Sequence, residues 1–196
     1  IIVIVFSIER ALVLRKAAGK GNVDNFVLSV RRLLDQNKID EAIEECDRQE
    51  GSVGNVVKEG LTTYKALAHD TTMNKEQKMV ALNKSIEEAT TLEMPMLEKN
   101  MMILSTLGTV ATLVGLLGTV IGMIKAFSAL GSGGGTPDSA ALSIGISEAL
   151  VNTALGIGTS AVAIILYNYF TSKIDGLTFK IDEIAMSIQQ SFAEFH

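Results

Sequence analysis

Two long apolar runs dominate the pattern of hydrophobic and polar positions along this chain. They cover Met101–Leu130 and Ala140–Phe170, and the polar, glycine-rich residues 131–139 separate them. Each run exceeds the ~20 apolar residues that a helix needs to cross the hydrocarbon core of a bilayer. We therefore predict transmembrane helices over residues 101–130 and 140–170, joined by a short loop over residues 131–139.

A third apolar run, Ile1–Phe6, opens the sequence, and the charged residues Glu9 and Arg10 follow it directly. Basic residues after an apolar stretch, rather than before it, are not the order of a signal peptide. Residues 1–9 are therefore predicted to be the end of a first transmembrane helix whose earlier residues lie outside this sequence. A short buried strand is the alternative.

Residues 10–100 have a helical pattern throughout, apart from a turn at Gly19–Asn22. Apolar residues recur at helical spacing over positions 23–34, and Asp40 is placed to cap a helix over residues 41–48. Two further helices are predicted over residues 52–68 and 72–100. The second of these runs directly into the membrane segment, and Pro95 is expected to interrupt it.

The tail, residues 171–196, has apolar residues at the spacing of an amphipathic helix. Such a stripe needs a partner, which could be residues 23–100 or another copy of the chain. The stripe consists of Ile174, Leu177, Ile181, Ile184, Ile188, Phe192 and Phe195.

The distribution of charge sets the orientation. Of the 17 Lys and Arg residues, 14 lie between Arg10 and Lys99, and the loop over residues 131–139 has none. By the positive-inside rule, residues 10–100 and the tail are cytoplasmic and the loop is extracytoplasmic. The net charge of −5 offers no basic surface for nucleic acid. His69 and His196 have no neighbours at ligand spacing, so no metal site is predicted.

Glu148 is the residue that most needs an explanation. It lies eight residues past Ala140, about 12 Å into the predicted helix, whereas Lys125 is close enough to its helix end to snorkel to the interface. An acidic residue at such a depth by default marks an ion or proton path. A protonated carboxyl that only joins helices by hydrogen bonds is the structural alternative.

Small and polar residues line one face of each predicted span, which permits close helix contact. Thr119 belongs to the first of these faces, whereas Glu148 and Thr153 lie on opposite flanks of the second. The first face consists of Gly108, Thr112, Gly115, Thr119, Gly122 and Ala126. The second consists of Gly145, Ala149, Asn152, Gly156, Ser160 and Ala163.

These two faces carry a family resemblance. The segments Gly115-Leu-Leu-Gly-Thr-Val-Ile-Gly-Met123 and Gly145-Ile-Ser-Glu-Ala-Leu-Val-Asn-Thr-Ala-Leu-Gly156, followed by Tyr167-Asn168, resemble the ExbB and TolQ branch of the MotA/TolQ/ExbB proton-channel family. The resemblance implies an all-α membrane protein with three spans per subunit and long helices that extend into a helical cytoplasmic domain. It also implies a homopentameric ring around two single-span partner helices.

By motif match, Glu148 takes the place of the pore glutamate of that family, and Thr119 and Thr153 take the places of its two threonines. The resemblance implies a motor subunit of the bacterial inner membrane that uses ion flow to energise transport or maintenance at the outer membrane. Its implied partners are an ExbD/TolR-like protein with a membrane acidic residue and a TonB/TolA-like energy transducer. No cofactor is implied.

Other functional classes stay open at this point. A non-transporting scaffold with a structural Glu148 is one alternative, and a sodium-driven stator of the same family is another. A secondary transporter is disfavoured because two or three spans provide no pair of inverted repeats. An enzyme is disfavoured because no nucleophile and base are placed to work together.

Overall fold

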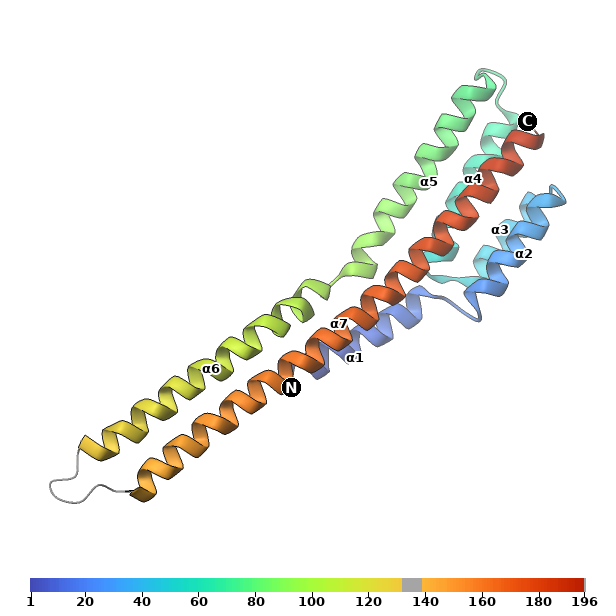
Figure 1. The fold of residues 1–196 in the computed structure, drawn as a ribbon. Helices are drawn as coiled ribbons and strands as arrows, with labels where there is room; N and C mark the ends of the chain where they lie inside the picture. The colour runs from blue at the N-terminus through green and yellow to red at the C-terminus, as the bar shows by residue number, and fades with distance from the viewer. Residues whose placement is uncertain (132–138, 196) are drawn as a thin grey trace. The chain divides into compact units, whose positions relative to one another are not determined.

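The computed structural model describes residues 1–131 and 139–195, and within these residues all regular structure is helical (Figure 1). The chain divides into two compact units. Unit 1 consists of Ile1–Ile8 and Asn100–Phe170, and unit 2 of Glu9–Lys99 together with the described part of Thr171–His196. The helices are α1 (Ile2–Ala17), α2 (Val23–Asp35), α3 (Ile39–Gln49), α4 (Gly51–His69), α5 (Lys75–Glu98), α6 (Met101–Gly131) and α7 (Ser139–Phe195).

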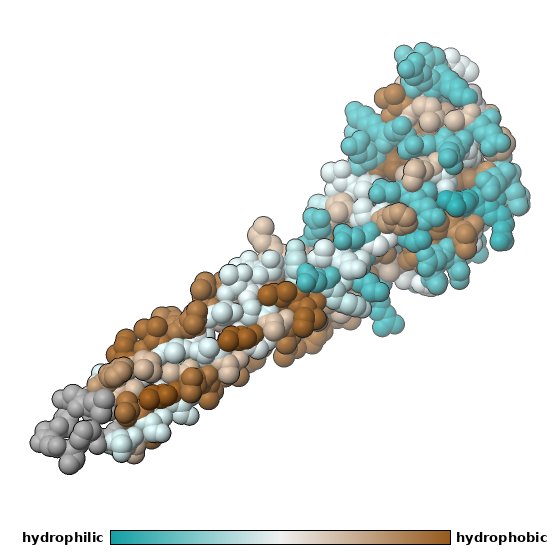
Figure 2. All heavy atoms as spheres, in the orientation of Figure 1, coloured by the Kyte–Doolittle hydropathy of each residue, from teal (hydrophilic) through white to brown (hydrophobic). Residues whose placement is uncertain are grey.

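Among the described residues, two helical stretches are long and apolar enough to cross a membrane: one includes most of α6, the other is α7, and both extend beyond unit 1. Their most apolar stretches are only 17% and 22% buried, so most side chains point outward. Figure 2 shows these hydrophobic side chains as brown spheres over α6 and the adjoining part of α7. The loop predicted over residues 131–139 falls mostly outside the described residues, since α6 ends at Gly131 and α7 begins at Ser139.

The first apolar run is helical, which excludes the alternative of a buried strand. Within unit 1, Val3 and Ser7 lie on the buried face of α1, one turn apart. The Ser7 hydroxyl donates to the carbonyl of Val3 at 2.6 Å, as a serine in a helix interior commonly does.

Unit 2 is a helical bundle with a conventional apolar core. Helices α2 to α5 contact one another in chain order, and α7 contributes residues Thr171–Phe195. The rings of Tyr64 on α4 and Phe192 on α7 meet edge to face, with centroids 4.9 Å apart. The buried stripe of α7 consists of Ile174, Leu177, Ile181, Ile184, Ile188 and Phe192. Within this chain, therefore, the partner of the tail lies in residues 23–100.

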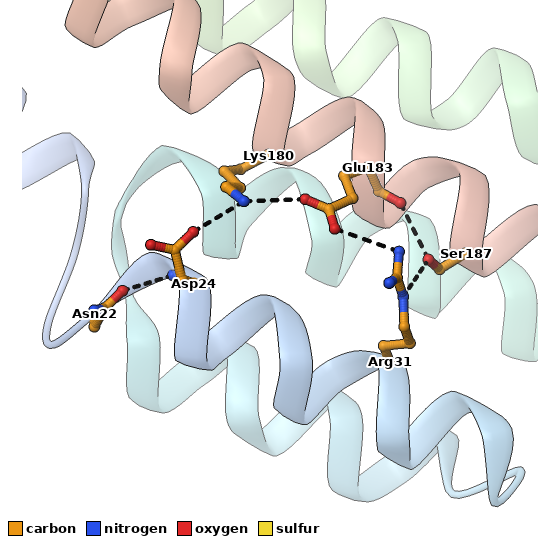
Figure 3. A network of polar contacts seen from close by, with 6 residues as sticks. All are labelled: Asn22, Asp24, Arg31, Lys180, Glu183 and Ser187. Carbon is orange, nitrogen blue, oxygen red and sulfur yellow. Dashed lines mark hydrogen bonds and ion pairs between the residues drawn. The ribbon is translucent and has the colours of Figure 1, made fainter.

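A polar network also joins α7 to α2 at the surface of unit 2 (Figure 3). The Lys180 ammonium lies 2.9 Å from Asp24 and 3.1 Å from Glu183. Arg31 donates to the Ser187 hydroxyl at 3.2 Å and lies 3.4 Å from Glu183. These contacts align α7 with α2 over nearly two turns.

Arg10 is the most deeply buried charged residue in unit 2, with an exposure of 0%. Its guanidinium binds both carboxylate oxygens of Glu9, at 2.8 and 2.7 Å, and donates to the Leu97 carbonyl at 3.2 Å. Leu97 lies in the last turn of α5, where carbonyls lack helical partners. Arg10 therefore donates a hydrogen bond to a carbonyl that lacks a helical partner at the end of α5. The carboxylate of Glu9 neutralises the charge of Arg10.

Three sequence predictions in this region are wrong. Asp40 does not cap α3, because the helix begins at Ile39, its N-cap is Lys38, and Asp40 falls in the first turn. Pro95 does not interrupt the helix that precedes the membrane segment: it lies inside α5, and the break comes at Asn100, which has φ +62°. An asparagine in the left-handed region is a common helix terminator. Phe195 is exposed rather than part of the buried stripe.

The start of α5 also differs from the prediction. The helix begins at Lys75 rather than at residue 72 because Asn74 and Gln77 form a capping box. The Asn74 side chain accepts from the Gln77 backbone at 2.8 Å, and the Gln77 side chain accepts from the Asn74 backbone at 3.0 Å.

The single cysteine, Cys46, is buried on α3. Burial raises the pKa of its thiol from 9.0 to about 12, and the neighbouring carboxylates of Asp47 and Glu45 add to the effect. The thiol is therefore neutral at physiological pH and contributes to unit 2 as a small apolar side chain.

Candidate functional site

The α6–α7 hairpin, made of α6 and residues Ser139–Phe170 of α7, holds the candidate site in unit 1. Its two helices approach closely at the glycines. A Cβ atom added to Gly115 would lie 2.9 Å from the Gly156 Cα, and one added to Gly156 would lie 2.8 Å from the Ala111 carbonyl oxygen. No larger residue fits at either position unless the backbones separate.

The other glycines named from the sequence lie at the same contact. A Cβ atom on Gly122 would lie 2.8 Å from the Ala149 Cβ, and one on Gly145 would lie 2.9 Å from the Ala126 Cβ. A Cβ atom on Gly108 would lie 2.8 Å from the Ile164 Cγ1. The small-residue faces thus pack against each other within one chain.

The two threonines meet across this contact. The hydroxyls of Thr119 on α6 and Thr153 on α7 are hydrogen-bonded to each other. Thr119 also lies within hydrogen-bonding distance of the carbonyls of Gly115, at 3.2 Å, and Ala149, at 3.3 Å. Both side chains are partly buried.

Glu148 does not join the threonines in the described structure but faces Lys125 on α6. The ammonium nitrogen and the nearer carboxylate oxygen lie 3.9 Å apart. The side chain of Lys125 is 67% exposed and that of Glu148 is 56% exposed. An acidic and a basic residue therefore lie together on the outer surface of the membrane-length hairpin.

These polar pairs occupy opposite edges of the hairpin. Thr153 follows Glu148 by five residues, which turns it by ~140° around α7, and Lys125 follows Thr119 by six residues, which turns it by ~120° around α6. We call the side with Lys125 and Glu148 the carboxylate edge and the side with Thr119 and Thr153 the hydroxyl edge. Within one chain, the carboxyl and the hydroxyls therefore lie on different sides of the hairpin.

An open groove of about 640 Å³ lies on the surface of α6 beside Thr119. Its lining is mainly apolar, and Thr119 and Ser128 are its two polar residues. The lining residues are Thr119, Val120, Met123, Ile124, Phe127 and Ser128.

Sequence reasoning missed the pairing of Lys125 with Glu148 because it assigned Lys125 to the interface. A signal existed: in a tight helical hairpin, residues at similar distances from the loop face each other. Gly118 was also missed, although a Cβ atom there would lie 2.8 Å from the Asn152 Cβ. No group of three or more His, Cys, Asp or Glu residues that could hold a metal occurs among residues 1–131 and 139–195.

Two apolar helices of membrane length, packed through small residues and carrying a charged pair on their outer surface, are typical of a helical membrane protein. A match to the MotA/TolQ/ExbB proton channel family covers residues 48–183. The chain belongs to this family.

Individual relatives agree with this assignment. The chain is 34% identical over 113 residues to the ExbB-like 3 biopolymer transport protein of Synechocystis, covering 57% of this chain and 54% of that protein. It is 33% identical over 113 residues to the biopolymer transport protein ExbB of Xanthomonas campestris, covering 57% and 44%. The Tol-Pal system protein TolQ of Pseudomonas aeruginosa is 28% identical over 131 residues, covering 65% and 55%. The chain thus spans about half the length of the curated relatives it matches.

Proposed function

We propose that this protein is an ion-conducting motor subunit of the bacterial inner membrane, in which Glu148 carries the ion. The observation that carries the proposal is the position of Glu148: a carboxyl that is 56% exposed on a membrane-length helix. An ionisable group is costly there and is retained where it handles ions. Membership of a proton channel family favours a proton as the ion.

The proposed subunit has three spans, the first of which ends within α1, and its unit 2 is cytoplasmic. It forms a homopentameric ring around an ExbD/TolR-like single-span partner, and ion flow drives a TonB/TolA-like transducer. The opposite edges of the hairpin support a ring, because the carboxylate edge of one subunit can then face the hydroxyl edge of the next. Glu148, Thr119 and Thr153 would then line one path.

Ion flux in liposomes tests the proposal. The native chain and its Glu148→Gln variant are each reconstituted with the single-span acidic partner, and flux is followed with an internal pH dye and, separately, a sodium dye. Glutamine keeps the size and hydrogen bonding of the side chain but cannot exchange a proton. We expect Glu148→Gln to abolish proton flux while the oligomer keeps its native size in chromatography.

The threonines are tested with valine, which has nearly the same shape but lacks the hydroxyl. We expect Thr119→Val and Thr153→Val each to lower ion flux, and neither to add to the effect of Glu148→Gln. Native flux in both valine variants would remove the threonines from the path and leave Glu148 as its only assigned residue.

One observation favours a second function, that of a non-transporting scaffold. The Lys125–Glu148 pair joins α6 to α7, so the carboxyl could serve only to stabilise the hairpin. Equal flux in native protein and Glu148→Gln, together with a lower melting temperature of the variant, would support the scaffold. Loss of flux at an unchanged melting temperature would exclude it.

A further inference from the structure

The carboxylate edge contains a basic residue that the proposed ion path does not use. Lys125 lies six residues before Gly131, the last residue of α6, and its ammonium faces Glu148 at 3.9 Å. The residue one helical turn before it on the same surface of α6 is apolar: Ile121, four residues before Lys125, is 47% exposed. A lone ammonium or carboxylate is costly in such surroundings, whereas a pair of opposite charge is less so.

The pairing of Lys125 with Glu148 is set by the register of the two helices, and not only by the length and flexibility of the lysine side chain. Gly122 lies three residues before Lys125 and contacts Ala149, the residue after Glu148. Ala126, the residue after Lys125, contacts Gly145 and is fully buried. These two contacts flank the charged pair and fix the register of α6 against α7, so Lys125 and Glu148 emerge on the same edge at the same level.

We propose that Lys125 is a positioning residue for ion transfer: it holds the Glu148 carboxylate on the carboxylate edge while the carboxylate is charged and releases it on protonation. This inference rests on the proposed function, since it assigns a role within the same path. The carboxylate and the ammonium attract each other, and a neutral carboxyl loses that attraction. The Glu148 side chain is then free to turn away from Lys125.

Each transfer cycle moves one proton through Glu148. A proton from water on the entry side bonds to a carboxylate oxygen of Glu148, and the Lys125 ammonium keeps all of its own protons. When the O–H bond breaks, the proton passes to water or to an acidic partner residue on the exit side. The negative charge returns to Glu148, which again pairs with Lys125.

Two measurements on the full-length chain in liposomes test this role. The first is the rate at which a hydrophobic carbodiimide, which adds to protonated carboxyls, modifies Glu148, read by mass spectrometry without any partner protein. The second is proton flux with the single-span acidic partner. Both compare native protein with Lys125→Met and Lys125→Arg. Lys180→Met is the matched control, because Lys180 pairs with carboxylates in unit 2.

In Lys125→Met we expect carbodiimide modification of Glu148 to become faster by about fivefold, the factor that an ion pair of ordinary strength supplies. Proton flux should fall by a similar factor. Arginine keeps the charge, so Lys125→Arg should restore both values, which a purely structural role would not require. Lys180→Met should change neither.

Equal modification rates in native protein and Lys125→Met, or a Lys125→Arg variant that behaves like Lys125→Met, would overturn the inference. Because the modification needs no partner and no transport, it tests the pairing independently. Native flux in Glu148→Gln would instead remove the proposed function. Loss of flux in Glu148→Gln with native flux in Lys125→Met would keep that function and reject the role of Lys125.

Discussion

Unit 1 and unit 2 use apolar residues in opposite ways. Unit 2 buries its large side chains, including Leu61 and Phe192, both at 0% exposure. Along the α6–α7 contact, unit 1 buries small residues, including Ala126 and Ala163 at 0%, and exposes large ones, such as Leu155 at 65%; larger residues such as Leu104 and Phe170 are buried nearer the ends of the two apolar runs. In unit 2 the large apolar side chains lie on the buried side of each helix, whereas along the α6–α7 contact of unit 1 they lie on the exposed side.

This difference is what a lipid solvent around unit 1 and water around unit 2 would favour. In water, burying large apolar side chains is the main source of stability, so they form the core of unit 2. In lipid the surroundings are as apolar as leucine, so close packing of small residues and hydrogen bonds hold helices together. The glycine contacts of the α6–α7 hairpin and the Thr119–Thr153 hydrogen bond fit that second regime.

The largest effect should come from emptying the core of unit 2. Phe192→Ala removes a fully buried ring that packs against Tyr64, and it should cost about 3–5 kcal/mol of unfolding free energy. The matched control is Phe127→Ala in α6, where the ring is 61% exposed and its loss leaves no cavity. We expect that control to stay within about 1 kcal/mol of native.

Melting followed by circular dichroism in detergent compares the two phenylalanine variants. Cys46 provides a second probe that reports on unit 2 alone, because it is the single cysteine of the chain and is buried there. Its labelling by a thiol reagent should begin at a lower urea concentration in Phe192→Ala. Equal losses in the two variants would contradict the inverted arrangement.

The next largest effect should come from enlarging a small residue in unit 1. Gly115→Leu forces a side chain into the Gly156 backbone. We expect it to lower the free energy of unfolding by about 1–3 kcal/mol, the range typical of overpacking. Gly158→Leu is the matched control, since a Cβ atom there meets nothing within 4 Å. Melting in detergent should fall clearly for Gly115→Leu only.

The stability of Gly115→Leu also tests whether the small-residue faces pack within one chain or between chains. From the sequence, these faces could pack within a chain or between chains. In the structure they pack within the hairpin, so the loss should appear in the isolated subunit as well as in the oligomer. A Gly115→Leu variant that melts like Gly158→Leu would show that the hairpin does not depend on this contact.

Much of this fold could be predicted from the sequence because its signals are local. The apolar runs fixed the cores of α6 and α7 to within one residue at their outer ends, as α6 runs Met101–Gly131 and α7 begins at Ser139. The stripe from Ile174 to Phe192 identified the buried side of the tail. Helical periodicity is a relation between residues three or four positions apart, so it can be read directly from the sequence.

The errors arose where several local signals competed or where contacts are distant. Asp40 and Pro95 are both compatible with a helix boundary, yet the chain places its boundaries at Lys38 and Asn100 instead. The pair of Lys125 and Glu148 depends on the register between two helices. That register is set by glycine contacts across the hairpin, which no single-helix pattern reveals.

The smallest effect should come from an ion pair in the solvent-exposed part of unit 2. Hydrogen bonds from Lys180 to Asp24, and then to Glu183, hold the pKa of Lys180 above its ordinary value of 10.5. The stabilisation that corresponds to this raised pKa is present below pH 10.5 and is lost as the pH rises through the raised value. Exposed pairs of this kind contribute little and are screened by salt.

Lys180→Met should therefore lower the melting temperature by about 2 °C or less at low ionic strength and neutral pH, with no difference in 1 M salt, where the Debye length is ~3 Å. The same substitution at Lys125 should behave differently, because its pair with Glu148 lies on a membrane-length surface that salt does not reach. Its effect on carbodiimide modification of Glu148 should persist in 1 M salt. If salt removed both effects equally, Lys125 and Glu148 would lie in water, and the assignment of the carboxylate edge to the membrane would be wrong.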